Sequence, residues 1–428
     1  MKHRLLTLAL AASLAGPALA ADPIKILFVG NSYTFGRVDP VLSYNAAAVH
    51  DLTAGFNAIN PTGTNSYPAG TVGFGSFEPH PWGGVPGIFK KMTDEAGMNY
   101  DVSLSTRNAA SLRGQFLNTA NADWKLRENV ATQKWDAVVL QEQSDAALPA
   151  GKGKNANLAT FNAYADQFER FIHNGAAQSY TEATLFGSLA ACKATGLSEA
   201  SCNATRTIAA NPNASTATKV YLEQSWARPD MVEAHKITKP DITTADGRPI
   251  VDTSSAGGNA TLYYATLAQM TADLHASFYD KAANNPGFTG VVPVGDAFQR
   301  AVNQGLAQGS GFYNASGTFA ETAGALNLWW LDRTHASKYG SYLSALTLFG
   351  SITGRDPLTL GAAEQAALDL GIDSATALAL QRVASEQLGF SAAVPEPQNA
   401  ALLLGGLAAL GFRASLRTGK RPGSLRPH

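Results

Sequence analysis

The segment Ile24-Lys25-Ile26-Leu27-Phe28-Val29-Gly30-Asn31-Ser32-Tyr33-Thr34 decides the fold expected for this chain. Its first six residues form a short apolar run, which predicts a buried strand. Gly30 then gives the backbone freedom to turn sharply, and Ser32 follows where the strand ends. Ligands bind at the carboxyl ends of strands in open α/β sheets, so Ser32 is a candidate nucleophile. Asn and Ser are also common in turns and helix caps, so both interpretations stay open at this point.

Strand and helix patterns alternate along the rest of the chain. Four more buried strands are predicted, at residues 101–105, 136–140, 219–222 and 290–294. Helical spacing of apolar residues appears around residues 88–92, 161–171, 263–278 and 339–349. This alternation predicts an α/β fold, a three-layer α/β/α sandwich around a mainly parallel sheet of about five strands. Residues 36–87 fit no element, and because they begin just after Ser32 they could wall a cleft.

Composition narrows the class of protein. The chain has 428 residues, 45% of them hydrophobic, which is enough for a large core. A net charge of -1 argues against nucleic acid as a partner. No Cys/His cluster has zinc spacing, so no metal site is predicted. Cys192 and Cys202 are the two cysteines, and we expect a disulfide between them, with two free thiols as the alternative.

The N-terminus has the pattern of a secretory signal. Basic residues Lys2 to Arg4 precede a short apolar stretch, and Ala18-Leu19-Ala20 matches a signal peptidase site. We therefore expect residues 1–20 to be a signal peptide, and the mature chain to be exported from Ala21.

The C-terminus carries a second candidate signal. Val394-Pro395-Glu396-Pro397 precedes an apolar stretch, residues 400–412, and a basic tail. This order resembles the PEP-CTERM sorting signal of Gram-negative bacteria. The resemblance implies transient anchoring in the inner membrane, processing by exosortase and delivery to the cell surface or extracellular matrix. Thirteen residues as a helix span ~20 Å, short of a ~30 Å hydrocarbon core, and a disordered tail is the alternative.

A nucleophilic serine needs a base, and the base needs a carboxylate to orient it. His335 lies three residues after Asp332 in Leu331-Asp332-Arg333-Thr334-His335. In a loop this spacing lets the carboxylate fold back onto the imidazole. Asp332 would hold the neutral tautomer, and His335 would take the proton from Ser32. Taken alone, the motif also fits an acidic residue at a helix start and a surface histidine.

Taken together, the two blocks resemble the SGNH/GDSL hydrolase family, in the subgroup whose first block reads Gly-Asn-Ser-x-Thr. The resemblance extends over residues 24–354 and includes Val138 to Ser144, Val292 to Ala297 and Gly340 to Leu343. It implies the flavodoxin-like strand order and ester hydrolysis by Ser32, His335 and Asp332. It implies no metal and no organic cofactor.

The same resemblance implies an oxyanion hole built from three groups. The first is the backbone N–H of Ser32. Where the family has a glycine this chain offers Ala110, and where the family has an asparagine it offers Gln143, with Gln141 as the other choice. We expect Glu142 and Asp145 to lie in a solvated loop without a role. Five further histidines are expected to be structural, namely His50, His80, His173, His235 and His275.

The sequence thus predicts a signal peptide (1–20), an SGNH hydrolase domain (21–355), a helical linker (356–393) and a sorting segment (394–428). The expected function is a serine esterase, with an extracellular polysaccharide or glycoconjugate as the substrate to be deacylated. Expected partners are the ester substrate, signal peptidase and exosortase. Two alternatives stay open: a non-catalytic surface or biofilm-matrix protein that keeps the fold, and acyl transfer to another sugar.

Overall fold

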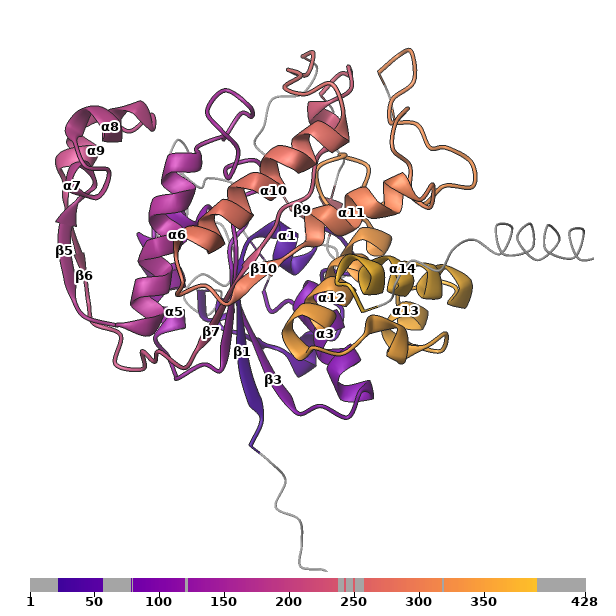
Figure 1. Cartoon of the computed structure of the whole chain (residues 1–428), viewed down its shortest axis with the longest axis horizontal. Helices are drawn as coiled ribbons and strands as arrows, with labels where there is room; N and C mark the ends of the chain where they lie inside the picture. The colour runs from indigo at the N-terminus through magenta and orange to yellow at the C-terminus, as the bar shows by residue number, and fades with distance from the viewer. Residues whose placement is uncertain are drawn as a thin grey trace, which may run out of the picture.

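The computed structural model describes residues 22–56, 78, 80–119, 122–237, 242–243, 249–250, 258–317 and 319–390. A parallel sheet stands at its centre with helices on both sides (Figure 1). The sheet has six strands in the order β10-β7-β4-β1-β3-β2. Their bounds are β1 Ile24–Gly30, β2 His50–Asp51, β3 Tyr100–Thr106, β4 Ala137–Gln141, β7 Lys219–Glu223 and β10 Gly290–Val292. Every pairing in this sheet is parallel.

The predicted fold class is confirmed, and the sheet has one strand more than expected. The five predicted strands are β1, β3, β4, β7 and β10, and their spatial order is the flavodoxin-like 2-1-3-4-5. The sixth strand, β2, has two residues at the edge of the sheet. A strand of two residues is too short to show any periodic pattern, so β2 could not be predicted.

Long helices cover both faces of the sheet (Figure 1). Helices α6 and α10 lie together on one face, where Phe161 contacts Phe278. Helices α3 and α12 lie on the other face, and α11 follows β10. The bounds are α3 Gly84–Glu95, α6 Leu158–His173, α10 Leu267–Asn284, α11 Val294–Asn303 and α12 Lys338–Thr353. Short helices are α1 Ser32–Phe35, α4 Leu112–Phe116 and α5 Leu126–Val130.

The core runs through all three layers. Ile26 to Val29 of β1 are completely buried, as the apolar run predicted. Every residue of α12 from Gly340 to Gly350 is buried too. A helix that is apolar all round fits between the sheet and an outer layer, and here that outer layer comes from the end of the chain.

Residues 178–208 form an insertion that the sequence did not predict in this form. Strands β5 (Gln178–Thr181) and β6 (Thr205–Ile208) make an antiparallel hairpin. Between them lie helices α7 Glu182–Leu185, α8 Leu189–Ala194 and α9 Glu199–Asn203. A disulfide between Cys192 and Cys202 joins α8 to α9. A separate antiparallel pair is formed by β8 (Ile242–Thr243) and β9 (Pro249–Ile250).

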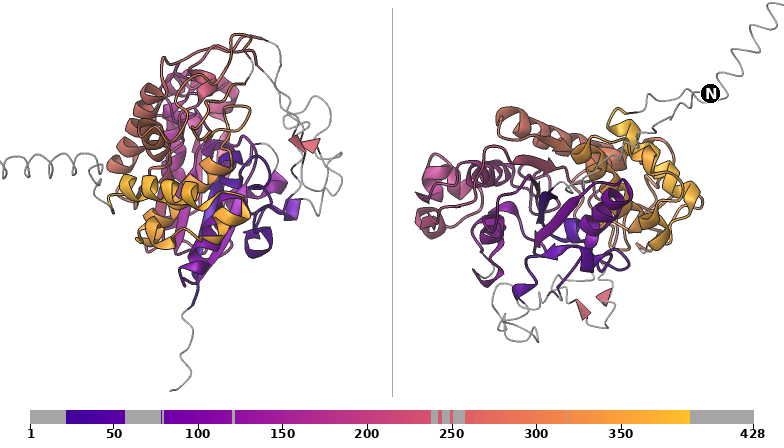
Figure 2. Two further views of the ribbon diagram at one scale, coloured as in Figure 1. Left: turned by 90° about the vertical axis from the view of Figure 1, so that its right-hand side faces the viewer. Right: turned by 90° about the horizontal axis from the view of Figure 1, so that it is seen from below.

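Residues 357–387 contain three helical elements, which pack into the main core. A 3-10 turn at Pro357–Leu360 precedes α13 Gln365–Asp369 and α14 Ser374–Gln387. Leu380 and Val383 of α14 are buried in the same cluster as the strands, so this segment belongs to the packed body. It lies at the opposite end of the molecule from the insertion (Figure 2). The predicted signal peptide and sorting segment lie outside the described residues. Within the described ranges no helix has the length and apolar character to cross a membrane.

Candidate active site

Ser32 lies at the carboxyl edge of the sheet, at the first position of α1. Asn31 caps this short helix, because its Oδ1 accepts a hydrogen bond from the backbone N–H of Tyr33 at 3.1 Å. A Cβ on Gly30 would stand 1.9 Å from Oγ1 of Thr34. Only glycine therefore lets α1 turn back this closely over the end of β1, which is what places Ser32 above the sheet.

The structure brings Ser32 together with the two other predicted catalytic residues. The Nε2 atom of His335 lies 2.8 Å from Oγ of Ser32, across 303 residues of sequence. Nδ1 of His335 lies 2.5 Å from Oδ2 of Asp332. The other carboxylate oxygen, Oδ1, accepts the backbone N–H groups of Thr334 at 3.0 Å and His335 at 2.9 Å.

These contacts set the charge of Asp332. Burial by itself would raise the pKa of the carboxyl group, but the charge of His335 and the hydrogen bonds to Asp332 outweigh it and lower the pKa to about 2. The carboxylate is therefore ionised at neutral pH and accepts the Nδ1–H of the ring. This leaves Nε2 as an acceptor for the hydroxyl proton of Ser32.

The loop that carries Asp332 and His335 is held from behind by a buried arginine. Arg333 adopts a left-handed backbone conformation, with φ of 56°, which is uncommon for a residue other than glycine. Its guanidinium donates to the carbonyl of Ala320 at 2.8 Å. The backbone N–H of Trp330 donates to the carbonyl of His335 at 2.7 Å, closing the loop. Nothing in the sequence singled out Arg333.

A column of aromatic rings packs below the histidine. Tyr33 stacks on Trp226 with ring centroids 3.8 Å apart, and Trp226 stacks in turn on Phe298 at 5.0 Å. The ring of Tyr33 meets His335 edge to face at 5.7 Å. Nε1 of Trp226 donates to the carbonyl of Thr334 at 3.0 Å. These contacts hold the imidazole of His335 in one position and orientation.

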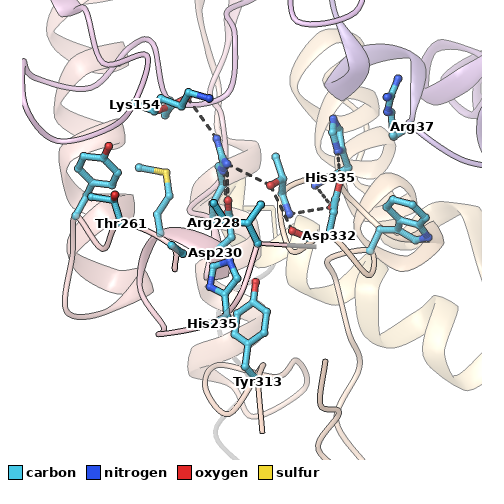
Figure 3. A pocket seen from close by; sticks show the side chains of 16 residues that line it. Arg37, Lys154, Arg228, Asp230, His235, Thr261, Tyr313, Asp332 and His335 are labelled. Carbon is cyan, nitrogen blue, oxygen red and sulfur yellow. Dashed lines mark hydrogen bonds and ion pairs between the residues drawn. The ribbon is translucent and has the colours of Figure 1, made fainter. Parts of the chain in front are cut away.

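A cavity of about 320 Å³ opens beside His335 (Figure 3), and we call it the main cavity. Arg228 crosses its wall and donates to both oxygens of Asp230, at 3.0 and 2.5 Å. The same guanidinium reaches Oγ1 of Thr334 at 3.2 Å and Oδ1 of Asp145 at 3.3 Å. The remaining lining includes Arg37, Lys154, His235, Tyr263, Tyr313 and Trp330.

Several of these residues were missed or misjudged at the level of sequence. The solvated loop predicted for Glu142 and Asp145 is wrong, because both side chains are buried. Burial raises the pKa of Glu142 to about 7, although its Oε1 accepts the N–H groups of Leu112 and Gln143. His235, expected to be structural, lines the main cavity. The residues of this wall are far apart in the chain, so no local motif could have grouped them.

The predicted oxyanion groups have different surroundings. The backbone N–H of Ser32, at the first helical position, has no acceptor within α1. The backbone N–H of Ala110 donates to the carbonyl of Arg107 at 3.2 Å, and its carbonyl accepts from Asn31 at 3.0 Å. The side chain of Gln141 accepts the N–H of Asn31 at 3.2 Å. Gln143 lines a neighbouring cavity.

A second histidine is enclosed by two carboxylates near the same edge of the sheet. His80 lies 2.5 Å from Asp51 and 3.2 Å from Glu78, and all three side chains are buried. Burial by itself would lower the pKa of His80, but Asp51 and Glu78 raise it to about 9. Oε1 of Glu78 also accepts the N–H of Asn108 at 2.6 Å, which ties this cluster to the loop after β3. In the part of the chain that the structure describes, no cluster of His, Cys, Asp and Glu has the arrangement of a metal site.

Comparison of the chain with known proteins finds similar solved structures, two of which are as follows. No family model matches the chain, and no curated protein matches it. One similar structure is "a putative SGNH hydrolase from Slackia heliotrinireducens", at 15% identity and a TM-score of 0.32, over 77% of this chain and all of that one. Another is a DUF4886 family protein from Bacteroides uniformis, at 12% identity and a TM-score of 0.39, over 85% of this chain and 94% of that one.

Proposed function

We propose that this protein is an ester hydrolase of the SGNH type, with Ser32 as nucleophile, His335 as general base and acid, and Asp332 as the orienting carboxylate. The observation that carries the proposal is the continuous hydrogen-bonded chain from Ser32 Oγ through His335 to Asp332. A hydroxyl, an imidazole and an ionised carboxylate in this geometry are the parts that acyl transfer through a serine requires.

The proposed reaction runs in two halves. Ser32 Oγ attacks the ester carbonyl carbon while His335 Nε2 takes the hydroxyl proton, and His335 then gives this proton to the departing alcohol. Water repeats the sequence on the acyl-serine and releases the acid. The N–H of Ser32 would stabilise the oxyanion, and the amide of Gln143 is our candidate for a second donor. The N–H of Ala110 would first have to leave the carbonyl of Arg107.

We propose a carbohydrate ester, on a polysaccharide or glycoconjugate, as the substrate. The main cavity supports this choice because it combines aromatic side chains, Tyr263, Tyr313 and Trp330, with charged groups such as Arg228 and Asp230. Rings that pack on sugar faces beside groups that bind hydroxyls suit a carbohydrate better than a long alkyl chain.

The test is hydrolysis of p-nitrophenyl acetate by the wild-type chain and by Ser32→Ala. Loss of the nucleophile is expected to lower kcat/KM by about 10⁴-fold or more. A fluorophosphonate probe should label the wild-type protein at Ser32, mapped by mass spectrometry, and should not label the variant. Equal hydrolysis by the two proteins, with no labelling, would refute the proposal that this protein is an esterase.

That refuting result would favour the second candidate, a non-catalytic binding protein on the cell surface or in a biofilm matrix. The observation behind this candidate is that Ala110 and Gln141, two of the oxyanion candidates, are engaged in hydrogen bonds within the protein. Binding of extracellular polysaccharide by the Ser32→Ala variant would then equal that of the wild type.

We further propose that the chain is exported and sorted to the surface through its two terminal signals. The support is the sequence pattern, because both signals lie outside the described residues. The experiment is fractionation of a Gram-negative host that has exosortase. If exosortase recognises the Pro-Glu-Pro motif, Glu396→Ala should leave the protein in the inner-membrane fraction. Unchanged delivery of this variant to the cell surface would contradict the proposal.

A further inference from the structure

A second cavity, of about 230 Å³, shares no lining residue with the main cavity. We call it the side cavity. Its wall combines the loops after β3 and β4 with the start of α6 and the tip of the insertion. Its lining includes the apolar residues Ala146, Phe161 and Leu197 and the charged residues Arg113 and Glu142. The proposed mechanism has so far used one residue of this lining, Gln143.

Two hydrogen bonds join the residue next to the nucleophile to the loops that line the side cavity. Asn31, the neighbour of Ser32, donates from its side chain to the carbonyl of Ala110, and the next residue, Ser111, lines the cavity. The backbone N–H of Asn31 donates to Gln141, two residues before Gln143. Both loops that contact Asn31 therefore continue directly into the cavity wall.

A hydrogen-bonded pair separates the two cavities. Asp145 lines the main cavity and Asn155 lines the side cavity. The backbone and side-chain nitrogens of Asn155 each donate to Asp145 at 2.9 Å. The two cavities therefore lie on either side of this pair, the main cavity lined by His335 and the side cavity lined by the loops after β3 and β4.

The outer wall of the side cavity is fixed by the insertion. Thr195 and Leu197 lie between α8 and α9, the two helices that the disulfide joins. The side chain of Asn157, just before α6, donates to the carbonyl of Thr195 at 2.7 Å. At the base of the insertion, buried Glu182 accepts from Arg113 at 2.6 and 2.8 Å. The tip is thus anchored at both ends and forms a firm wall.

We propose that the side cavity is the binding site for the acyl group of the substrate, and that the insertion sets the length of the acyl chain. The proposal rests on the proposed function. His335 must protonate the oxygen of the leaving alcohol, so the alcohol belongs in the main cavity that His335 lines. The acyl substituent points away from the carbonyl carbon in another direction, which we assign to the side cavity because Gln143, our candidate oxyanion donor, lines it. Ala146, Phe161 and Leu197 give that cavity apolar surface for it.

The size of the cavity indicates a short acyl group. The side cavity, at about 230 Å³, is smaller than the main cavity at about 320 Å³. We match it to a short acyl group such as butyryl, and a lauroyl chain would extend out of it into solvent. The acyl-serine formed in the first half-reaction would keep the chain in the side cavity while the alcohol leaves from the main cavity.

The experiment varies Leu197, which is half-buried at the tip, and measures kcat/KM on p-nitrophenyl acetate, butyrate and hexanoate. Leu197→Trp narrows the cavity and should lower the butyrate-to-acetate ratio at least tenfold. Leu197→Ala widens it and should move the optimum toward hexanoate. Ala190→Trp, an exposed position on α8 of the same insertion, is the control and should change neither ratio.

The outcomes separate this proposal from the one it rests on. Equal effects of Leu197→Trp on acetate and butyrate, or no effect on either, would overturn the acyl site and leave the esterase intact. Hydrolysis that does not depend on Ser32 would overturn the esterase and the acyl site with it. Opposite shifts by the two Leu197 variants would support the acyl site even if one of them loses some stability.

Discussion

Replacing Asp332 by asparagine tests the role of the carboxylate most directly. The amide keeps an oxygen that can accept the backbone N–H groups of Thr334 and His335, so the loop should retain its shape. The amide nitrogen cannot accept the Nδ1–H that now lies 2.5 Å from Oδ2. The amide nitrogen would instead donate to Nδ1, so the neutral ring would carry its proton on Nε2. Because Nε2 faces Ser32, the ring could then no longer take the serine proton. We expect kcat/KM to fall by about 10⁴-fold, or about 5 kcal/mol of activation free energy.

The same substitution should cost stability in a way that depends on pH. Lowering the pKa of Asp332 from 3.8 to about 2 corresponds to about 2 kcal/mol of folding free energy at neutral pH. Because this pKa is lower in the folded chain, the stabilisation is present above about pH 4 and disappears as the pH falls toward 2. The difference in urea stability between wild type and Asp332→Asn should therefore shrink over that range.

The assay is hydrolysis of p-nitrophenyl acetate together with urea unfolding followed by circular dichroism. The matched control is Asp101→Asn, the same chemical change in a surface pair where Asp101 lies 3.1 Å from exposed His50, at the amino end of β3. The control should keep full activity. An Asp332→Asn rate within tenfold of wild type, or an equal loss in the control, would refute the role assigned to the carboxylate.

Three further predictions follow from the packing and the charges. Trp226→Ala removes the central ring of the aromatic column and should lower the free energy of unfolding by about 3–5 kcal/mol in urea; a loss under 1 kcal/mol would contradict the packing. The free energy of unfolding of the wild type should fall as the pH rises from about 6.5 to about 9, because the pKa of His80 is raised in the folded chain. His80→Gln should remove this pH dependence. The measurement is the urea midpoint of both proteins from pH 6 to 10. Replacing Cys192 and Cys202 by serine should lower the free energy of local unfolding of the insertion by ~2–3 kcal/mol and speed its proteolysis. Hydrolysis of p-nitrophenyl acetate should be retained. Unchanged proteolysis would show that other contacts hold the tip of the insertion.

Strands β1 and β4 were predictable because each buries a continuous apolar run, Ile26 to Val29 and Ala137 to Leu140, which is what a strand covered on both faces requires. The grouping of Ser32, His335 and Asp332 was predictable because two recognisable sequence blocks carry them, one directly after β1 and the other shortly before α12. Arg228, His235 and Tyr313 were not predictable as a group. Arg228 and His235 lie in the connection after β7 and Tyr313 lies after α11, and only the folded chain brings the three to one cavity.

Asp145 and Glu142 show a different limit of the sequence. Acidic residues after a strand usually lie in water, and a solvated loop was the natural prediction. Here Arg228 and Asn155 donate hydrogen bonds to Asp145, and two backbone N–H groups donate to Glu142. Burial of a carboxyl group depends on partners contributed by distant segments, which a local pattern does not contain. The hairpin of the insertion was missed for a similar reason, because its strands have only four residues each.

The packing of α13 and α14 matters for anyone who shortens the chain. A protein that stops at residue 355, where the sequence suggests a boundary, would leave one side of α12 bare, and α12 begins three residues after His335. Apolar side chains now covered by Leu380 and Val383 would meet water, and aggregation would be easily mistaken for lack of enzymatic competence. A chain that ends at residue 390 keeps both helices, and it is the shortest form in which a negative activity result would carry meaning.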